Sequence, residues 1–156
     1  MKEILQLQDR LDFLNKQDAC RDSFMEYIRY IWPGFIEGEH HRVISKRLTA
    51  VAKGELKRLI INMPPRHTKS EFASIYFPSW MMGLQPDLKI MQTTHTADLS
   101  INFGRKVRNL MDTEEYAKIF PDVNLAADSK SAGKWQTSTG GEYFAAGVGG
   151  AIAGRG

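Results

Sequence analysis

The order of the apolar segments constrains the fold of this chain more than any other feature. Arg58–Asn62 and Leu88–Thr94 are short apolar runs of the kind that forms strands. Between them, the segment from Lys69 to Met82 has helical character, and Ala97 to Met111 repeats apolar residues at helical spacing. Strands that alternate with helices are typical of a parallel sheet covered by helices. We therefore predict an α/β fold with a parallel sheet flanked by helices.

The segment before this alternation is expected to be helical. The first 32 residues predict two helices, the second of which ends at Trp32 because Pro33 disfavours helix in the residue before it. A third helix is expected from Glu39 to Lys53, followed by Gly54 as a C-terminal cap. The first two helices carry no catalytic chemistry and suggest a layer for packing or for docking a partner. Their apolar stripes are formed by Ile4, Leu7, Leu11 and Leu14 and by Phe24, Tyr27, Ile28 and Ile31.

Further elements follow in the second half of the chain. Pro78 is expected to kink or interrupt the helix that begins at Lys69. A short helix is predicted from Glu114 to Phe120, and Trp135–Ser138 and Glu142–Ala146 predict a hairpin around three turn residues. The last ten residues contain five glycines.

Composition sets broad limits on the class of protein. The chain has 156 residues, of which 42% are hydrophobic and 25% charged, as in an ordinary globular protein. No apolar run is long enough to span a membrane, and the N-terminus lacks the apolar region of a signal peptide. The single cysteine, Cys20, excludes an internal disulfide and a zinc site built from cysteines. We therefore expect a cytosolic protein that is not secreted.

Positive charge is concentrated in two stretches, although the net charge is only +3. Such stretches are consistent with nucleic-acid binding, but the simpler interpretation is that they form solvated helix faces. The first stretch contains Arg42, Lys46, Arg47, Lys53, Lys57 and Arg58, and the second contains Arg105, Lys106 and Arg108.

The loop after the first predicted strand carries the strongest chemical signal. A phosphate-binding loop places Lys-Ser or Lys-Thr at a helix N-terminus, where backbone amides and the helix dipole hold phosphates. Lys69 and Ser70 stand at this position, and Arg66 adds a cation three residues earlier. The alternative is an ordinary strand–loop–helix connection with a basic residue at the start of the helix.

This loop departs from the standard pattern G-x-x-x-x-G-K-[ST]. Met63 replaces the first glycine and Thr68 the second. Pro64 and Pro65 remove two amide donors and stiffen the entry to the loop.

The stretch from Met63 to Glu71 closely resembles the deviant Walker A sequence of tailed-phage terminase large subunits, in which an arginine precedes Gly-Lys-Ser or its variants. The resemblance covers roughly residues 24–156, whereas residues 1–23 add nothing specific. It implies an N-terminal helical segment at 1–36 and a partial P-loop ATPase domain at 37–156. The other similar stretches are His40–Ile44, Gly54–Asn62, Trp135–Thr137 and Gly147–Gly156.

The resemblance also implies roles for the loop residues. Lys69 would contact the β- and γ-phosphates of ATP, Ser70 would hold Mg²⁺, and Arg66 would stabilise the γ-phosphate. A surface salt bridge is the alternative for Arg66. His67 would hydrogen-bond a phosphate or only orient the loop. Pro65, Thr68 and Glu71 complete the expected nucleotide-binding loop.

Three further residues are candidates for contacts with nucleotide or nucleic acid. His41 occupies the place where the family often has a residue that reads the adenine edge; a packing role is the alternative. His95 follows the second strand, near the edge where ligands bind in open α/β sheets. Arg155 would act in a neighbouring subunit or contact a DNA phosphate, unless it simply faces solvent.

ATP hydrolysis needs groups that this sequence does not contain. No apolar run ends in the paired acids of a Walker B strand, and nothing resembles the family's nuclease domain. We expect an incomplete P-loop sheet that stops before the Walker B strand, and negligible ATP hydrolysis by this chain alone.

The resemblance implies the ATP-binding part of the motor that translocates double-stranded DNA into a procapsid. Expected partners are double-stranded DNA bound without sequence preference, the portal protein and the small terminase subunit, with a homo-oligomeric ring in the full-length protein and no membrane. The expected location is the host cytoplasm, with transient docking on the procapsid. Alternatives are another P-loop ATPase that acts on nucleic acid, such as a helicase-like enzyme, or a non-catalytic remnant or binding module.

Overall fold

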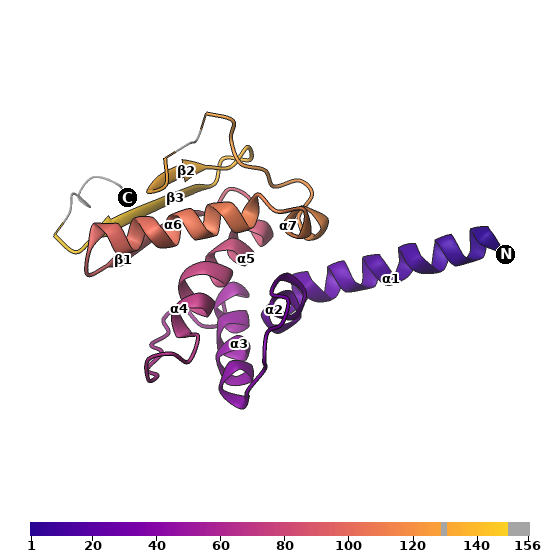
Figure 1. Cartoon of the computed structure of the whole chain (residues 1–156), viewed down its shortest axis with the longest axis horizontal. Coiled ribbons are helices and arrows are strands. Elements are labelled where there is room, and N and C mark those ends of the chain that lie inside the picture. Colours follow the sequence, from indigo (N-terminus) through magenta and orange to yellow (C-terminus); the bar gives the residue numbers. More distant parts are fainter. Residues whose placement is uncertain (129–130, 150–156) are drawn as a thin grey trace. The chain divides into compact units, whose positions relative to one another are not determined.

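The computed structural model describes residues 1–128 and 131–149, in an α/β arrangement with two compact units (Figure 1). The first unit is Met1–Ile61 and the second is Asn62–Gly156. The division therefore lies after Ile61, whereas the functional boundary expected from the sequence lies after residue 36. Among the described residues, no helix is both long enough and apolar enough to cross a membrane.

The first unit consists of three helices, as the sequence predicts. They are α1 (Lys2–Asp22), α2 (Phe24–Ile31) and α3 (Glu39–Ala52). Ser23 separates α1 from α2 because its side chain caps the second helix: the Glu26 N–H donates to its Oγ at 3.5 Å. The core of this unit lies between α2 and α3, where the buried apolar residues are Phe24, Tyr27, Ile28, Ile31, Ile44 and Leu48.

The apolar stripe of α1 does not pack into this core. Ile4, Leu7, Leu11 and Leu14 are all exposed, and only the last turns of α1 contribute a buried residue, Cys20. Figure 1 shows the N-terminal half of α1 extending away from α2 and α3. The stripe therefore explains why the helix is amphipathic but contributes little to the stability of the unit.

The strand predicted at Arg58–Asn62 is not formed, so this prediction is wrong. A strand is stable only when a neighbouring strand pairs with its N–H and C=O groups. The described sheet contains other strands only, and the side chain of Ile60 is 86% exposed. Apolar, β-branched composition alone does not produce a strand without that pairing.

The second unit contains a mixed sheet of three strands in the order β1-β3-β2. Strands β1 (Lys89–Thr94) and β3 (Glu142–Gly147) run parallel, whereas β2 (Lys134–Gln136) pairs antiparallel with β3. The hairpin was expected, whereas the parallel strands expected from the sequence were Arg58–Asn62 and Leu88–Thr94, and β1 pairs with β3 instead. Helix α6 (Ala97–Met111) lies between the parallel strands in sequence and packs on both of them.

A continuous helical segment precedes β1. It begins as α4 (Lys69–Glu71), continues as the π-helical turn η1 (Phe72–Tyr76) and ends as α5 (Phe77–Leu84). Pro78 has no N–H to donate to the α-helical hydrogen-bond ladder. The interruption expected at this residue takes the form of the π-helical turn η1, which lies just before it. The Ser79 hydroxyl donates to the Tyr76 carbonyl at 2.8 Å and satisfies one of the carbonyls in this turn.

The contact between α6 and the sheet forms the tightest part of the second unit. Gly104 on α6 allows this approach, because a Cβ there would lie 2.9 Å from the Tyr143 ring and 2.6 Å from the Ala132 carbonyl oxygen. The Trp135 indole donates to the Gly104 carbonyl at 3.1 Å and stacks on the Tyr143 ring, with 4.9 Å between centroids. The Ser100 hydroxyl donates to the Ala146 carbonyl at 2.7 Å. A last helix, α7 (Glu114–Ile119), follows α6 as predicted.

Candidate functional site

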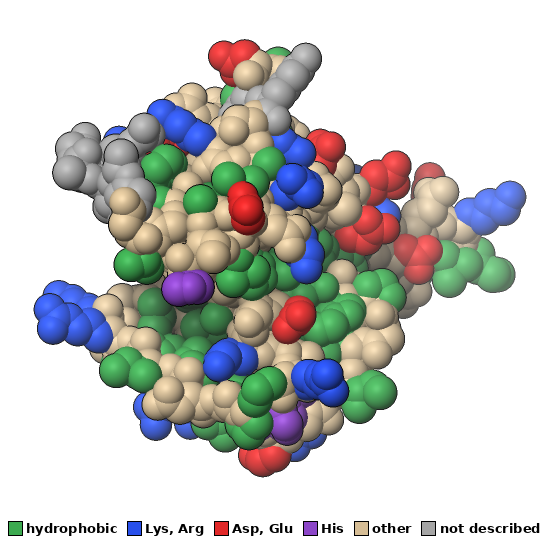
Figure 2. All heavy atoms as spheres, turned by 60° about the vertical axis from the view of Figure 1, so that its left-hand side comes forward, with side chains coloured by type: hydrophobic (Ala, Val, Ile, Leu, Met, Phe, Trp, Pro, Cys, Tyr) green, Lys and Arg blue, Asp and Glu red, His purple; other side chains and the backbone are tan. Residues whose placement is uncertain are grey.

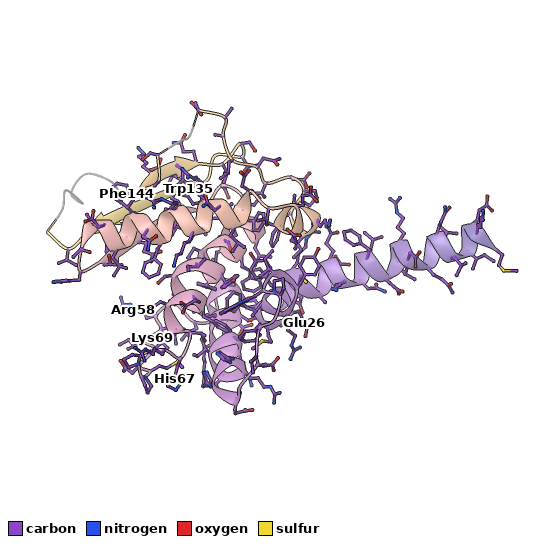
Figure 3. All side chains as sticks on the ribbon, viewed as in Figure 1. Glu26, Arg58, His67, Lys69, Trp135 and Phe144 are labelled. Atoms are coloured by element: carbon purple, nitrogen blue, oxygen red, sulfur yellow. The ribbon has the colours of Figure 1, made fainter. Side chains whose placement is uncertain are left out.

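The candidate phosphate-binding loop runs from Met63 to Thr68 and leads directly into α4, which begins at Lys69 as predicted. Figure 3 shows His67 and Lys69 in this loop and at the start of the helix. The first N–H groups of a helix have no acceptor within the helix. The start of α4 therefore presents backbone donors beside the Lys69 ammonium and the Ser70 hydroxyl.

Two residues of the loop have left-handed backbone conformations, which non-glycine residues rarely adopt. Arg66 has φ 64°, and Thr68 has φ 57° and ψ 12°. Thr68 stands where the standard pattern has its second glycine, so the structure retains the backbone conformation that favours glycine. A left-handed residue next to a helical one turns successive N–H groups to one side, which is a geometry suited to anions.

This conformation predicts the effect of Thr68→Gly. Glycine adopts positive φ without a steric penalty, so we expect the free energy of unfolding to rise by about 0.5 kcal/mol, after allowance for the extra freedom of glycine in the unfolded chain and for the lost hydrogen bond from the Thr68 hydroxyl to the His67 carbonyl. Urea unfolding followed by circular dichroism measures the change. The matched control is Thr113→Gly, because Thr113 caps α7 at φ −86° and glycine should be destabilising there. Equal destabilisation by both substitutions would contradict the account of Thr68.

Three hydrogen bonds hold the loop together from within. His67 Nδ1 lies 2.9 Å from the Pro65 carbonyl oxygen, and the Thr68 hydroxyl donates to the His67 carbonyl at 2.7 Å. Lys69 Nζ donates to the Met63 carbonyl at 3.4 Å, across the base of the loop. This last distance is near the limit for a hydrogen bond, so an anion with a full charge would compete well for the ammonium.

The remaining loop residues differ in exposure. Pro65, Arg66 and Ser70 are exposed, whereas Glu71 is half-buried. Within residues 1–128 and 131–149, Arg66 makes no ion pair, so the alternative of a surface salt bridge finds no support there. The side chains proposed to contact the γ-phosphate and Mg²⁺ are therefore accessible to a ligand from solvent.

His41 lies in the first unit and is buried near the start of α3. Its Nδ1 accepts from the Gly38 N–H at 2.9 Å, and its ring packs edge-on against Phe35 at 4.8 Å. These contacts give His41 a capping and packing role, which was the alternative considered for it. Its contact with adenine stays a prediction.

His95 and Arg155 were the other two residues predicted to contact nucleotide or nucleic acid. His95 is exposed directly after β1, at the expected edge of the sheet. Arg155 lies outside the described residues, so its role as a subunit or DNA contact stays a prediction.

The basic residues of the first stretch lie on α3 and the segment that follows it. Arg42 pairs with Glu37 and Glu39, and Lys53 pairs with Asp22. In the face shown in Figure 2, Lys and Arg side chains lie in several separate places. The ion pairs of Arg42 and Lys53 favour solvated helix faces for this stretch.

A hollow of about 440 Å³ in the second unit was missed by sequence reasoning. It lies between η1 and α5 on one side and β1 on the other, and Phe77, Met81 and Ile90 contribute to its apolar lining. The signal in the sequence was a single residue: Met91 is apolar, although it shares the exposed face of β1 with Lys89 and Thr93. No group of three or more His, Cys, Asp or Glu side chains in the described part could hold a metal ion.

Comparisons with known proteins do not assign the site. No family model matches the chain, no curated protein matches it, and no solved structure matches it.

Proposed function

We propose that the loop Met63–Thr68 and the start of α4 bind the triphosphate of ATP with Mg²⁺. The observation that carries this proposal is the placement of Lys69 and Ser70 at the first two positions of a helix, directly after the left-handed residue Thr68. Backbone N–H groups, an ammonium and a hydroxyl then face one end of the same helix. This is the donor set that a phosphate group and its magnesium ion require.

Each side chain has a defined role in this proposal. Lys69 leaves the Met63 carbonyl and contacts the β- and γ-phosphates, and Ser70 ligates Mg²⁺ through its hydroxyl. Arg66 contacts the γ-phosphate, where its charge offsets the negative charge that develops during phosphoryl transfer. Pro65, His67, Thr68 and Glu71 shape the loop.

A P-loop-type fold is part of the same proposal. It is supported by the parallel pair of β1 and β3 and by the helix α6 that connects them. In that fold a strand precedes the loop, and the absence of a strand at Arg58–Asn62 counts against it.

We propose further that the chain is the ATP-binding part of a terminase-like motor that moves double-stranded DNA. The support is the resemblance of Met63–Glu71 to the deviant Walker A loop of that family. DNA would be bound through its phosphates, with affinity that falls as salt rises. The portal protein, the small terminase subunit, a ring of copies and docking on a procapsid in the host cytoplasm belong to this proposal on the same basis.

Ser70→Ala tests the proposal, because it separates a magnesium-nucleotide site from simple anion binding. We expect Mg²⁺ to tighten the binding of a non-hydrolysable ATP analogue to the unmodified chain by about tenfold, and Ser70→Ala to remove most of that gain. Isothermal titration calorimetry with and without Mg²⁺ measures both quantities. Ser74→Ala, one turn further along the helix, is the matched control and should keep the full gain.

An equal magnesium effect in the Ser70→Ala and unmodified chains would contradict the assignment of Ser70. If no analogue binds at all, the non-catalytic alternative is favoured, and Lys69 then serves only to close the loop through the Met63 carbonyl.

A further inference from the structure

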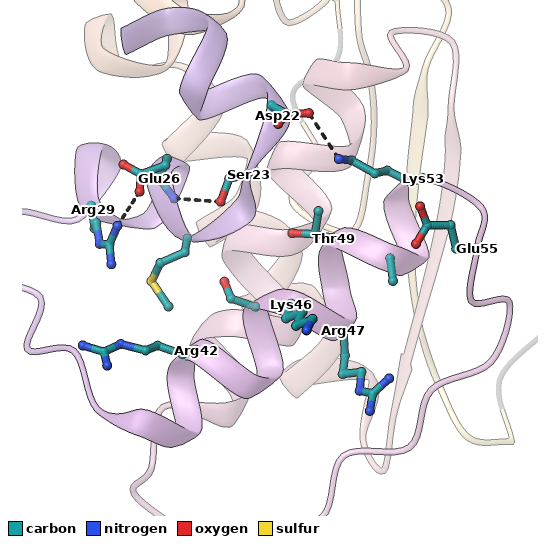
Figure 4. A pocket seen from close by; sticks show the side chains of 13 residues that line it. Asp22, Ser23, Glu26, Arg29, Arg42, Lys46, Arg47, Thr49, Lys53 and Glu55 are labelled. Carbon is teal, nitrogen blue, oxygen red and sulfur yellow. Dashed lines mark hydrogen bonds and ion pairs between the residues drawn. The ribbon is translucent and has the colours of Figure 1, made fainter.

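The first unit contains a hollow of about 610 Å³ that the proposed nucleotide site does not use. It is formed by the end of α1, the start of α2 and one face of α3 (Figure 4). Its size is in the range of small-molecule binding sites. Its lining is rich in charged and hydroxyl side chains, so a polar ligand fits it better than an apolar one.

Positive charge exceeds negative charge in this lining, with five Lys or Arg residues against three Asp or Glu residues. Arg29 and Arg42 are both held by Glu37, at 2.8 and 2.6 Å, and they lower the pKa of its carboxyl group to about 2. These two guanidinium groups share the Glu37 carboxylate, and each pairs with a second one, Arg29 with Glu26 and Arg42 with Glu39, so their charges are already compensated.

Two cations of the lining make no ion pair with the described residues. Lys46 and Arg47 are exposed neighbours on α3 and make no ion pair with any described residue. Of the three carboxylates, Asp22 pairs with Lys53, and Glu26 pairs with Arg29. Glu55 makes no ion pair in the described part of the chain, so the unpaired charges of the lining are two positive and one negative.

A buried hydroxyl gives an independent indication of a ligand. Ser45 lines the hollow and is only 2% exposed, and its Oγ has no hydrogen-bond partner among the described residues. A buried polar group without a partner is costly, so such a group usually has a ligand or water. Thr49 lies one turn further on the same face of α3, and Ser23 caps α2 beside it.

Two of these hydroxyl oxygens already accept a hydrogen bond from the backbone. The Thr49 oxygen accepts from the Phe24 N–H at 3.3 Å, and the Ser23 oxygen accepts from the Glu26 N–H at 3.5 Å. Each hydroxyl proton can therefore be directed to a further acceptor.

From this arrangement we propose that the hollow binds a phosphate group. A phosphate offers several acceptor oxygens and up to two negative charges. The lining supplies the hydroxyls of Ser23, Ser45 and Thr49 as donors and the charges of Lys46 and Arg47. The phosphate would be inorganic phosphate or a phosphate of a nucleic-acid backbone. The inference does not depend on nucleotide binding at Lys69.

The test is a titration of the full chain, labelled with ¹⁵N, with inorganic phosphate, against sodium chloride at equal ionic strength. Saturable shifts of the Ser45, Lys46 and Thr49 amides are expected with phosphate and not with chloride. The double substitution Lys46→Gln, Arg47→Gln should weaken binding about tenfold, and Ser45→Ala should weaken it about threefold. The matched control is Lys57→Gln, Arg58→Gln, which removes the same charge from the neighbouring segment and should change affinity less than twofold.

Lys46 and Arg47 are exposed, so their substitution should leave the fold intact, and a melting curve by circular dichroism confirms this for each variant. A second titration with a short DNA duplex identifies the source of the phosphate. If the duplex saturates the shifts at a much lower concentration of phosphate groups than inorganic phosphate does, the ligand is a nucleic-acid backbone. If the duplex binds more weakly than inorganic phosphate, the ligand is free phosphate. Absence of saturable shifts with both ligands, or equal weakening by the two double substitutions, would overturn the proposal.

Discussion

Trp135→Ala is expected to lower the free energy of unfolding of the second unit by about 3–5 kcal/mol, the usual range for a buried tryptophan truncated to alanine. Trp135 is fully buried on β2. Its ring stacks on Tyr143 from β3, and its indole N–H donates to the Gly104 carbonyl of α6 at 3.1 Å. One side chain therefore connects the hairpin to the crossover helix. Its removal leaves a cavity and takes away the indole hydrogen bond to the Gly104 carbonyl.

Urea unfolding followed by far-ultraviolet circular dichroism measures this loss. Phe144→Ala is the matched control, because Phe144 is a half-buried aromatic residue in the same hairpin (Figure 3). We expect it to cost less than half as much. Trp135→Phe should recover most of the loss and leave about 1–2 kcal/mol for the missing hydrogen bond. If truncation of Trp135 costs no more than truncation of Phe144, the packing of α6 on the sheet is not as described.

Lys69→Ala is expected to weaken the binding of an ATP analogue by about 10–100-fold. A hydrogen bond from a charged donor to a phosphate contributes about 1.5–3 kcal/mol, and this range corresponds to that change in affinity. The substitution should leave stability almost unchanged, because the only contact of Nζ in the described chain is the long one to the Met63 carbonyl. Fluorescence anisotropy of a labelled ATP analogue measures the affinity.

Lys89→Ala is the control for Lys69→Ala, since Lys89 is an exposed lysine of β1 in the same unit. It should change the affinity less than twofold. Equal effects of the two substitutions would mean that the nucleotide responds to the overall charge of the unit and not to the loop.

Elements that depend on local sequence could be predicted well. Helices α2, α3, α6 and α7 begin and end within a few residues of the expected positions, because their apolar spacing and capping residues lie within each segment. The hairpin of β2 and β3 was also predictable, since its turn and its two strands are adjacent in sequence.

Features that depend on which distant segment is the partner could not be predicted in this way. The run Arg58–Asn62 has the composition of a strand, but no described strand pairs with it. The exposed stripe of α1 shows the same limit: Ile4 and Leu7 define an amphipathic helix without defining what covers its apolar face.

The candidate site was predictable in its chemistry but only partly in its geometry. Lys69 begins a helix as expected, whereas the left-handed backbone at Thr68 was not predicted. The capping role of His41 depends on its contact with Gly38 and Phe35, and sequence could not separate that role from a ligand contact. The hollow beside Ser45 depends on how α2 packs against α3, so the basic residues around it appeared as a solvated face.

The most direct test of the central claim is a titration of the ¹⁵N-labelled chain with the magnesium complex of a non-hydrolysable ATP analogue, read at each backbone amide. Nucleotide binding by the loop predicts saturable shifts that are largest from Arg66 to Phe72, at the start of α4. Shifts that leave these amides unchanged, whether they occur elsewhere or not at all, would contradict it.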